Sequence, residues 1–268
     1  MAATNDITQM FVGSNQVQSL YAGSTLLWSA GGGGTDDNFD NVSLLIHATG
    51  DNGSTTFTDS SSNGLDITGS GGVSISSEQT LFGNNSIRFD GTDDYLTIAA
   101  DESLSFGLGD FTVEFWIYSS VRHSGTPFAR VIETNQIFTT NGDFKIWLTG
   151  NDAEGNFGAS NNAIEHAAQD NQDVIVSSEF TLNRWNHVAI TREDGVGSRI
   201  FMNGVIQETV TDNTNYNQAG TRGFVIGYRP YFEDNTYFNG FLSEIRITTG
   251  VARYTENFDV PTTTFPDS

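Results

Sequence analysis

The feature that most constrains the fold is a succession of short segments in which apolar and polar residues alternate. In FTVEFWIY, Phe111 to Tyr118, every second residue from position 111 is apolar, so one face of an extended strand is apolar. Comparable segments recur along the chain, and Asn203-Gly204 between two of them is typical of a two-residue hairpin turn. Roughly a dozen such segments predict an all-β jelly-roll sandwich of two antiparallel sheets. The Ala-rich stretch NNAIEHAAQ is expected to form a helical turn or two.

The first thirty or so residues form a separate unit. A short pattern occurs in both Phe11–Asn15 and Tyr21–Thr25, and each copy contains a Gly-Ser pair suited to a tight turn. We expect a small three-stranded β-meander within 1–29, a Gly-rich tether over 30–41 and the jelly roll over 42–268. Three short strands cannot bury their own apolar side chains, so we expect the meander to dock on another surface. The docking residues would be Phe11, Val12, Leu20, Tyr21, Leu26, Leu27 and Trp28.

Charge and composition limit the partners. The formal net charge is −22, with 33 acidic residues against 11 Lys and Arg. Phosphate backbones and anionic lipids repel such a chain, so we expect neither nucleic-acid binding nor membrane insertion. The start of the chain lacks the basic and apolar regions of a signal peptide, and cysteine is absent, which predicts synthesis in the cytoplasm. Acidic loops also suit calcium, although the charge could simply maintain solubility.

Several blocks of sequence, in order, resemble the concanavalin A-like, laminin G-like jelly-roll domain that is common in bacteriophage and marine viral structural proteins. The blocks extend from about Val42 to Phe265 and include LFGNNSIRFDGTDDYLTI, RWNHVAITRE and RIFMNGVIQ. This fold serves lectins, glycanases and structural modules alike. The N-terminal repeat is similar to a short segment at the start of phage virion proteins. That resemblance implies that the meander anchors the chain to a virion partner or to other copies of itself.

Catalytic residues are not apparent in the sequence. Glycanases of this fold need two carboxylates close together on one sheet face. Asp93 and Asp94 are adjacent and would point to opposite faces if extended. The histidines lie in strand patterns or in loops, away from any nucleophile motif. The acidic residues within strand patterns each stand alone: Glu114, Glu133 and Glu244. We therefore expect a non-enzymatic protein.

The resemblance also implies one structural calcium ion, which in related jelly rolls joins the N-terminal loop to the last strand. Calcium takes about six to eight oxygen ligands. Positions that match are Asp59, Asn63, Asp90 and Glu244. Thr49 stands where family members often carry Asp, so one carboxylate is missing. In the alternative interpretation, Asp59 and Asn63 only form the hydrogen bonds of a turn.

A carbohydrate site is expected in the aromatic and acidic loop RPYFEDNTYFNG. Rings of this kind stack on sugar faces while polar groups bind hydroxyls. The candidates are Arg229, Tyr231, Phe232, Glu233, Asp234, Tyr237 and Phe238. Alternatively, these rings pack against the adjacent strand or a neighbouring subunit. Trp116, Trp147 and Trp185 fall in strand patterns, which favours packing in the core or on a sheet face.

Two functions fit these observations. The first is a non-enzymatic virion protein, made in the host cytoplasm and displayed as a fiber, capsid decoration or tail-associated appendage, with other virion proteins as partners and a trimer as the expected oligomer. The second is a dedicated carbohydrate-binding module, or lectin, that adsorbs the particle to a host glycan. A glycan hydrolase is a distant third, because the sequence lacks a carboxylate pair.

Overall fold

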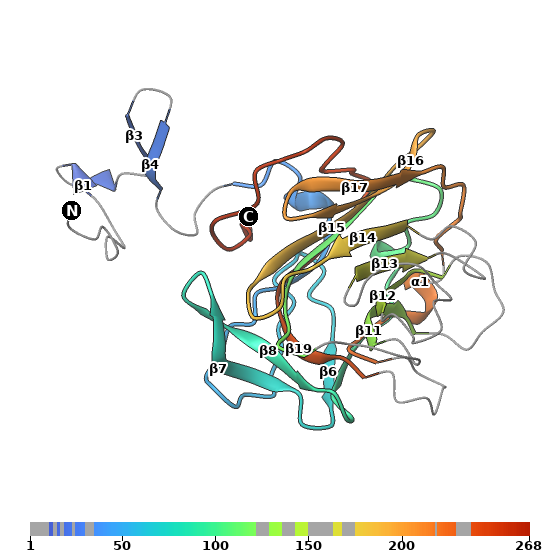
Figure 1. The fold of residues 1–268 in the computed structure, drawn as a ribbon, viewed down its shortest axis with the longest axis horizontal. Helices are drawn as coiled ribbons and strands as arrows, with labels where there is room; N and C mark the ends of the chain where they lie inside the picture. The colour runs from blue at the N-terminus through green and yellow to red at the C-terminus, as the bar shows by residue number, and fades with distance from the viewer. Residues whose placement is uncertain are drawn as a thin grey trace.

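The computed structural model describes residues 35–121, 129–135, 143–149, 163–167, 175–217, 219–228 and 237–268, together with four short strands between positions 11 and 29. The regular secondary structure of the described chain is almost entirely β-strand, as predicted (Figure 1). Three short helical turns, none longer than four residues, accompany the strands: η1 (Phe39–Asn41), η2 (Glu102–Leu104) and α1 (Ala219–Arg222). No helix in the described part is long and apolar enough to cross a membrane.

Two antiparallel sheets form the sandwich. The eight-stranded sheet has the order β17 (Val205–Val210), β16 (Gly197–Met202), β15 (Asn186–Glu193), β10 (Phe111–Tyr118), β19 (Asn239–Thr249), β8 (Asn84–Asp90) and β7 (Ser74–Leu81), with β5 (Val42–Ile46) also paired to β19. The seven-stranded sheet has the order β14 (Ile175–Glu179), β13 (Ala163–Ala167), β12 (Lys145–Thr149), β11 (Ala129–Thr134), β18 (Phe224–Ile226), β9 (Tyr95–Ile98) and β6 (Ile67–Ser70).

The alternation in β10 divides the core from the outer face of its sheet. Its alternate residues Phe111, Val113, Phe115 and Ile117 are fully buried in the large core between the sheets. Phe111 stacks on Phe106 with ring centroids 4.5 Å apart. Asn203 and Gly204 both have positive φ, at 51° and 77°, which confirms the predicted hairpin turn between β16 and β17.

The outer face of the eight-stranded sheet is also partly buried, because the C-terminal segment, residues 251–268, crosses it. The backbone N–H of Arg253 donates to Thr112 Oγ1 at 2.9 Å, and the ring of Phe265 packs with Val42 and Leu45 in a small second core. The start of the domain joins the same layer, since Asp36 N donates to the carbonyl of Ser268 at 3.0 Å. Alternation within a strand does not predict this covering.

Two predictions need correction here. The N-terminal strands form two separate hairpins, β1 (Phe11–Val12) with β2 (Asn15–Gln16) and β3 (Ser19–Ala22) with β4 (Thr25–Ser29), so each repeat is its own two-stranded sheet where one meander was expected. The docking side chains and the Gly31–Gly34 tether lie outside the described residues, so docking stays a prediction. The Ala-rich stretch contributes β13, because pairing with β12 outweighs its helical propensity.

Candidate functional site

Three tyrosines from different elements meet on the surface beside the loop between β8 and β9. Tyr95 begins β9, Tyr228 follows β18 and Tyr237 precedes β19. The rings of Tyr228 and Tyr237 are stacked, with centroids 4.3 Å apart and planes at 10°, and Tyr95 lies 5.4 Å from Tyr228. All three side chains are partly exposed. We call them, together with Asp90, Asp93 and Asp94, the tyrosine–aspartate patch.

The local sequence explains how these elements come together. Gly227 has a φ of 92°, and a Cβ atom at this position would lie 2.6 Å from the Phe89 ring and 3.2 Å from the carbonyl of Asp94. Only glycine lets the end of β18 pass so close to the aspartate loop. The N–H of Phe238 donates to the Gly227 carbonyl at 2.8 Å. This bond and the tyrosine stack therefore join the two ends of the segment 229–236.

The aspartates of the patch lie on a turn. One carboxylate oxygen from each of Asp90, Asp93 and Asp94 lies within 4.8 Å of the other two. Asp93 and Asp94 would face apart only in an extended chain. This part of the chain bends between β8 and β9, so they do not. Asp94 is fully buried and accepts hydrogen bonds from Gly72 N and Asp90 N, whereas Asp93 is exposed.

Burial and neighbouring groups separate the acidities of these aspartates. Burial raises the pKa of Asp94, and the charges of Asp90 and Asp93 add to the increase, although two backbone N–H groups oppose it. For Asp90, burial again acts to raise the pKa, but the hydrogen bonds from Thr92 and Asp93 and the charge of Arg88 outweigh it, and the pKa is lowered. Asp90 therefore keeps a negative charge at neutral pH and can accept hydrogen bonds.

The expected calcium ligands lie in different hydrogen-bond networks. Asp59 accepts four hydrogen bonds, from Leu45 N, both Ser61 N and Ser61 Oγ, and Leu65 N, all at 2.8–2.9 Å. Both of its oxygens are thus used in holding the turn against β5, which favours the alternative role considered for this residue. Asn63 donates its side-chain amide to the Ser43 carbonyl at 3.1 Å, and so belongs to the same turn.

Glu244 belongs to another network. Its Oε2 accepts from Phe265 N at 2.8 Å and lies 2.9 Å from His47 Nδ1, while its Oε1 is buried with no hydrogen-bond partner among the described residues. Asp90 is the one expected calcium ligand that the described structure places beside further carboxylates. The three aspartates of the patch have the oxygen donors that calcium prefers, whereas the saturated oxygens of Asp59 do not suit an ion.

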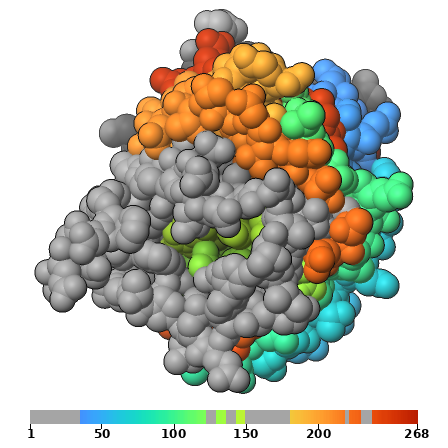
Figure 2. All heavy atoms as spheres, turned by 90° about the vertical axis from the view of Figure 1, so that its right-hand side faces the viewer, coloured from blue at the N-terminus to red at the C-terminus, as the bar shows by residue number. Residues whose placement is uncertain are grey.

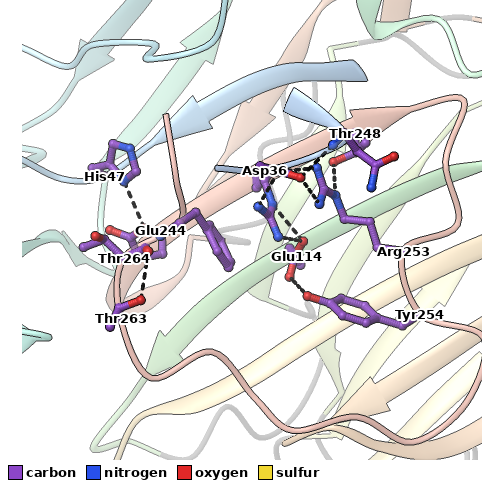
Figure 3. Close-up of polar contacts among 12 residues, drawn as sticks. Asp36, His47, Glu114, Glu244, Thr248, Arg253, Tyr254, Thr263 and Thr264 are labelled. Carbon is purple, nitrogen blue, oxygen red and sulfur yellow. Dashed lines mark hydrogen bonds and ion pairs between the residues drawn. The ribbon is translucent and has the colours of Figure 1, made fainter. Parts of the chain in front are cut away.

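A buried network of charges crosses the outer face of the eight-stranded sheet (Figure 3). Glu114 accepts from Arg246 Nη2 at 2.7 Å and from Tyr254 Oη at 2.9 Å, and His187 Nε2 lies 3.2 Å away. Asp36 binds Arg246 and Arg253. Although burial acts to raise the pKa of Glu114, the charge of Arg246 and then the His187 hydrogen bond lower it to about 2.

A catalytic acid needs a raised pKa, so Glu114 does not suit that role. The network instead fastens the C-terminal segment to the sheet. The carboxylate, the guanidinium groups and the tyrosine hydroxyl satisfy one another directly, which is the condition under which buried charges are tolerated.

A further set of charged residues lies on the face of the seven-stranded sheet that points away from the core. Figure 2 looks onto this face, where atoms of β11 and β12 are visible in yellow-green. Arg130 is the register partner of Trp147, and its guanidinium carbon lies 4.7 Å from the centre of that ring. Glu133 is the register partner of Lys145 and lies 3.5 Å from Arg130. No sequence pattern marks this group, because only strand pairing brings the residues together.

The sequence of the described fold has a family match. A sequence model described as "Concanavalin A-like lectin/glucanases superfamily" matches residues 90–254, more than half of the chain. The chain belongs to the concanavalin A-like lectin/glucanase superfamily. This match confirms the resemblance to the concanavalin A-like jelly-roll domain and agrees with the observed fold. A search of curated protein sequences finds none that matches this superfamily member.

Solved structures with the same fold include binding domains of bacterial toxins. The binding domain of Paraclostridial Mosquitocidal Protein 1 is 17% identical with a TM-score of 0.56, and the match covers 80% of this chain and 50% of that one. The botulinum neurotoxin serotype D domain in complex with N-acetylneuraminic acid is 14% identical with a TM-score of 0.56, covering 80% and 48%. A structure of botulinum neurotoxin type C has the same TM-score and identity, covering 80% and 49%. This superfamily member thus spans about half the length of those chains, and the likeness is one of fold.

The predicted sugar-binding loop is only partly described in this jelly roll. Tyr237 lies in the tyrosine–aspartate patch. Phe238 is fully buried and packs 5.7 Å from Phe89, so it belongs to the core and not to a sugar site. The remaining candidates, Arg229, Tyr231, Phe232, Glu233 and Asp234, lie outside the described residues and stay predictions.

Proposed function

We propose that this protein is a non-enzymatic, carbohydrate-binding jelly roll that a virion displays as an appendage. The observation that carries the proposal is the tyrosine–aspartate patch, in which partly exposed rings lie next to the aspartate turn, where Asp90 keeps its negative charge. Aromatic faces pack on the apolar faces of sugars, and carboxylates accept hydrogen bonds from sugar hydroxyls. The patch also lies at the base of the loop from which sugar binding was predicted.

Two of the solved neighbours support a glycan as the ligand. Cell entry of botulinum neurotoxin type C is dependent upon interaction with two ganglioside molecules. The serotype D domain was solved with N-acetylneuraminic acid. These findings concern those toxins. They support the proposal because they show this fold within sugar-binding proteins, and the tyrosine–aspartate patch supplies suitable groups in this chain.

The virion role rests on the N-terminal repeats. Two short hairpins precede a glycine-rich stretch, and isolated two-stranded hairpins are barely stable in water. We propose that they dock on other virion proteins, with several copies, as in a trimer, presented together after synthesis in the host cytoplasm. Weak sugar binding by each copy then adds up through multivalency. Deletion of residues 1–34 should abolish incorporation into particles while the jelly roll stays folded. Particles that still incorporate the truncated chain would contradict docking.

One structural calcium ion remains part of the proposal. Asp90, which the resemblance implied, would hold it with Asp93 and Asp94 of the same turn. The ion would supply positive charge to a strongly acidic chain.

A glycan array tests the carbohydrate role. We expect wild-type protein to bind a subset of glycans and Tyr237→Ala to abolish that binding, because the variant loses one ring of the stack. Tyr237→Phe is the matched control, since it keeps the ring. Val196→Ala lies at an exposed turn between β15 and β16, and it should bind glycans as the wild type does, which shows that preparing a variant does not itself change binding. Silence of the wild-type protein across the array, or binding unchanged in Tyr237→Ala, would contradict the proposal.

A hydrolase is the alternative, and the outer face of the seven-stranded sheet, where β11 and β12 carry charged residues, is where it would act. The carboxylates there, Glu133 and Asp143, each lie beside a cation, Arg130 at 3.5 Å and Lys145 at 3.7 Å. Prolonged incubation with the glycans bound on the array should release no reducing ends. Release that is lost in Glu133→Gln would replace the binding role with a catalytic one.

A further inference from the structure

A row of aromatic side chains crosses the outer face of the eight-stranded sheet at the end of β10. Tyr118 is the register partner of Phe241 on β19, and Phe241 is the register partner of Arg88 on β8. On the other side, the Trp185 ring lies 5.7 Å from that of Tyr118, and the Tyr118 and Phe241 rings are 5.9 Å apart. We call Trp185, Tyr118, Phe241 and Arg88 the aromatic row.

The aromatic row stays accessible where the rest of this face is covered. The C-terminal segment lies over residues further back along the strands, where Tyr254 and Phe258 pack beside His187. By contrast, the three rings of the row are partly exposed. The indole of Trp185 is held in place, because its Nε1 donates to the carbonyl of Thr80 at 2.9 Å.

The next residues along these strands contribute polar groups without partners. Trp116 and Ser243 are register partners, two residues from Tyr118 and Phe241 respectively. Trp116 Nε1 and Ser243 Oγ are buried and have no hydrogen-bond partner among the described residues. Trp116 is covered by the partly exposed ring of Phe82, which meets it edge to face at 5.4 Å. Buried polar groups of this kind are rare in folded proteins, so these two distinguish the strand positions beneath the row from an ordinary satisfied core.

Cations flank the aromatic row, although the chain has only 11 Lys and Arg. Arg88 ends the row, and exposed Arg184 directly precedes Trp185. Arg88 lies 3.6 Å from Glu78, but the two side chains are 41% and 66% exposed. Such an exposed pair contributes little, so Arg88 can turn to an anionic ligand at small cost. The row therefore combines apolar rings with two arginines on a chain whose net charge is −22, with the carboxylates of Glu78 and Asp90 near Arg88.

We propose that the aromatic row is a second saccharide-binding surface, specific for an extended oligosaccharide of uronic acids. Strands lie about 4.8 Å apart, so successive sugar rings can meet successive side chains of the row. The sugar faces pack on Trp185, Tyr118 and Phe241, and the uronate carboxylates bind Arg88 and Arg184. The inference goes beyond the proposed function, because the aromatic row shares no residue with the tyrosine–aspartate patch.

Isothermal titration of the full chain with an oligogalacturonate and with a neutral oligosaccharide of equal length tests this inference. We expect the uronate to bind and the neutral sugar to bind at least tenfold more weakly. Trp185→Ala should weaken uronate binding about tenfold, the loss of one aromatic contact, whereas Trp185→Phe should retain most of it. Arg88→Gln combined with Arg184→Gln should remove the preference for uronate and reduce the salt dependence of binding.

The thermal unfolding temperature of each variant shows that it is folded. Absence of uronate binding by the wild-type chain, equal binding of the neutral sugar, or uronate binding unchanged in Trp185→Ala would each overturn the inference. Tyr237→Ala separates the two surfaces, because it should abolish glycan-array binding and leave uronate binding unchanged. If uronate binding is instead lost in Tyr237→Ala and kept in Trp185→Ala, the ligand binds at the tyrosine–aspartate patch and the aromatic row is not a site.

Discussion

Replacement of Glu114 by glutamine tests how the C-terminal segment is held. The carboxylate is fully buried and binds Arg246, Tyr254 and His187, so its loss leaves a buried guanidinium short of a counter-charge. The carboxyl pKa falls from an ordinary value of 4.5 to about 2 in the folded protein. Such a difference corresponds to roughly 3 kcal/mol of folding free energy at neutral pH. Removing one partner of a buried ion pair costs about 3–5 kcal/mol, which agrees.

The pH dependence has a defined sign. Because the folded-state pKa of Glu114 is below the unfolded value, its contribution is complete above about pH 4.5 and is lost as the pH falls towards 2. Glu114→Gln should therefore unfold about 3 kcal/mol more easily at pH 7, with a melting temperature lower by roughly 6–12 °C. Between pH 4.5 and 2, its stability should fall less steeply than that of the wild type.

Urea denaturation between pH 2 and pH 7 measures both effects. Glu256→Gln is the matched control, because Glu256 is an exposed acid of the same C-terminal segment. It should change the unfolding free energy by less than about 0.5 kcal/mol. If Glu114→Gln were as stable as this control at pH 7, or if the two variants lost stability equally between pH 4.5 and 2, the reasoning would be refuted.

Three further predictions concern packing, backbone and metal. Phe265→Ala should lower the unfolding free energy by about 3 kcal/mol, since the ring is buried and lies 3.8 Å from the Arg246 guanidinium. Urea denaturation measures this, and a loss under about 1 kcal/mol would show that the C-terminal segment packs loosely. Gly227→Ala should destabilise the fold by at least about 1 kcal/mol, because its Cβ would lie 2.6 Å from the Phe89 ring at positive φ, and an unchanged melting temperature would contradict this. Calcium at a hundredfold excess over its Kd should stabilise the chain by about 2.7 kcal/mol, and a chelator or Asp93→Asn should remove this effect. A melting temperature that does not change with calcium or chelator would count against the site.

Local sequence predicted the strands well where one pattern dominated. The alternation of Phe111 to Tyr118 identified the core-facing residues, and Asn203-Gly204 identified the hairpin turn, because both depend only on adjacent residues. The Ala-rich stretch that became β13 shows the limit of such reasoning. Pairing of its backbone with β12 outweighed the weak helical preference of alanine.

The site depended on contacts between distant segments and was predicted only in part. Tyr237 was identified from its aromatic loop, but its partners Tyr95 and Tyr228 lie on other elements, and strand order alone brings them together. Glu114 looked isolated because its ligands come from residues more than 70 positions away. Strand register likewise brings Tyr118 beside Phe241, and Trp185, just before β15, contacts the Tyr118 ring, although in sequence all three look like ordinary strand residues.

The bonds of Asp36 determine how the domain would bear tension. Asp36 lies ahead of β5, near the start of the sandwich, and it is tied to Arg246, Arg253 and the Ser268 carbonyl. A mechanical force applied from the N-terminal side would therefore load the ion pairs of Asp36 with Arg246 and Arg253 before it loaded β5. These ion pairs share the force between β19 and the C-terminal segment, so the sandwich would resist being peeled apart from its first strand.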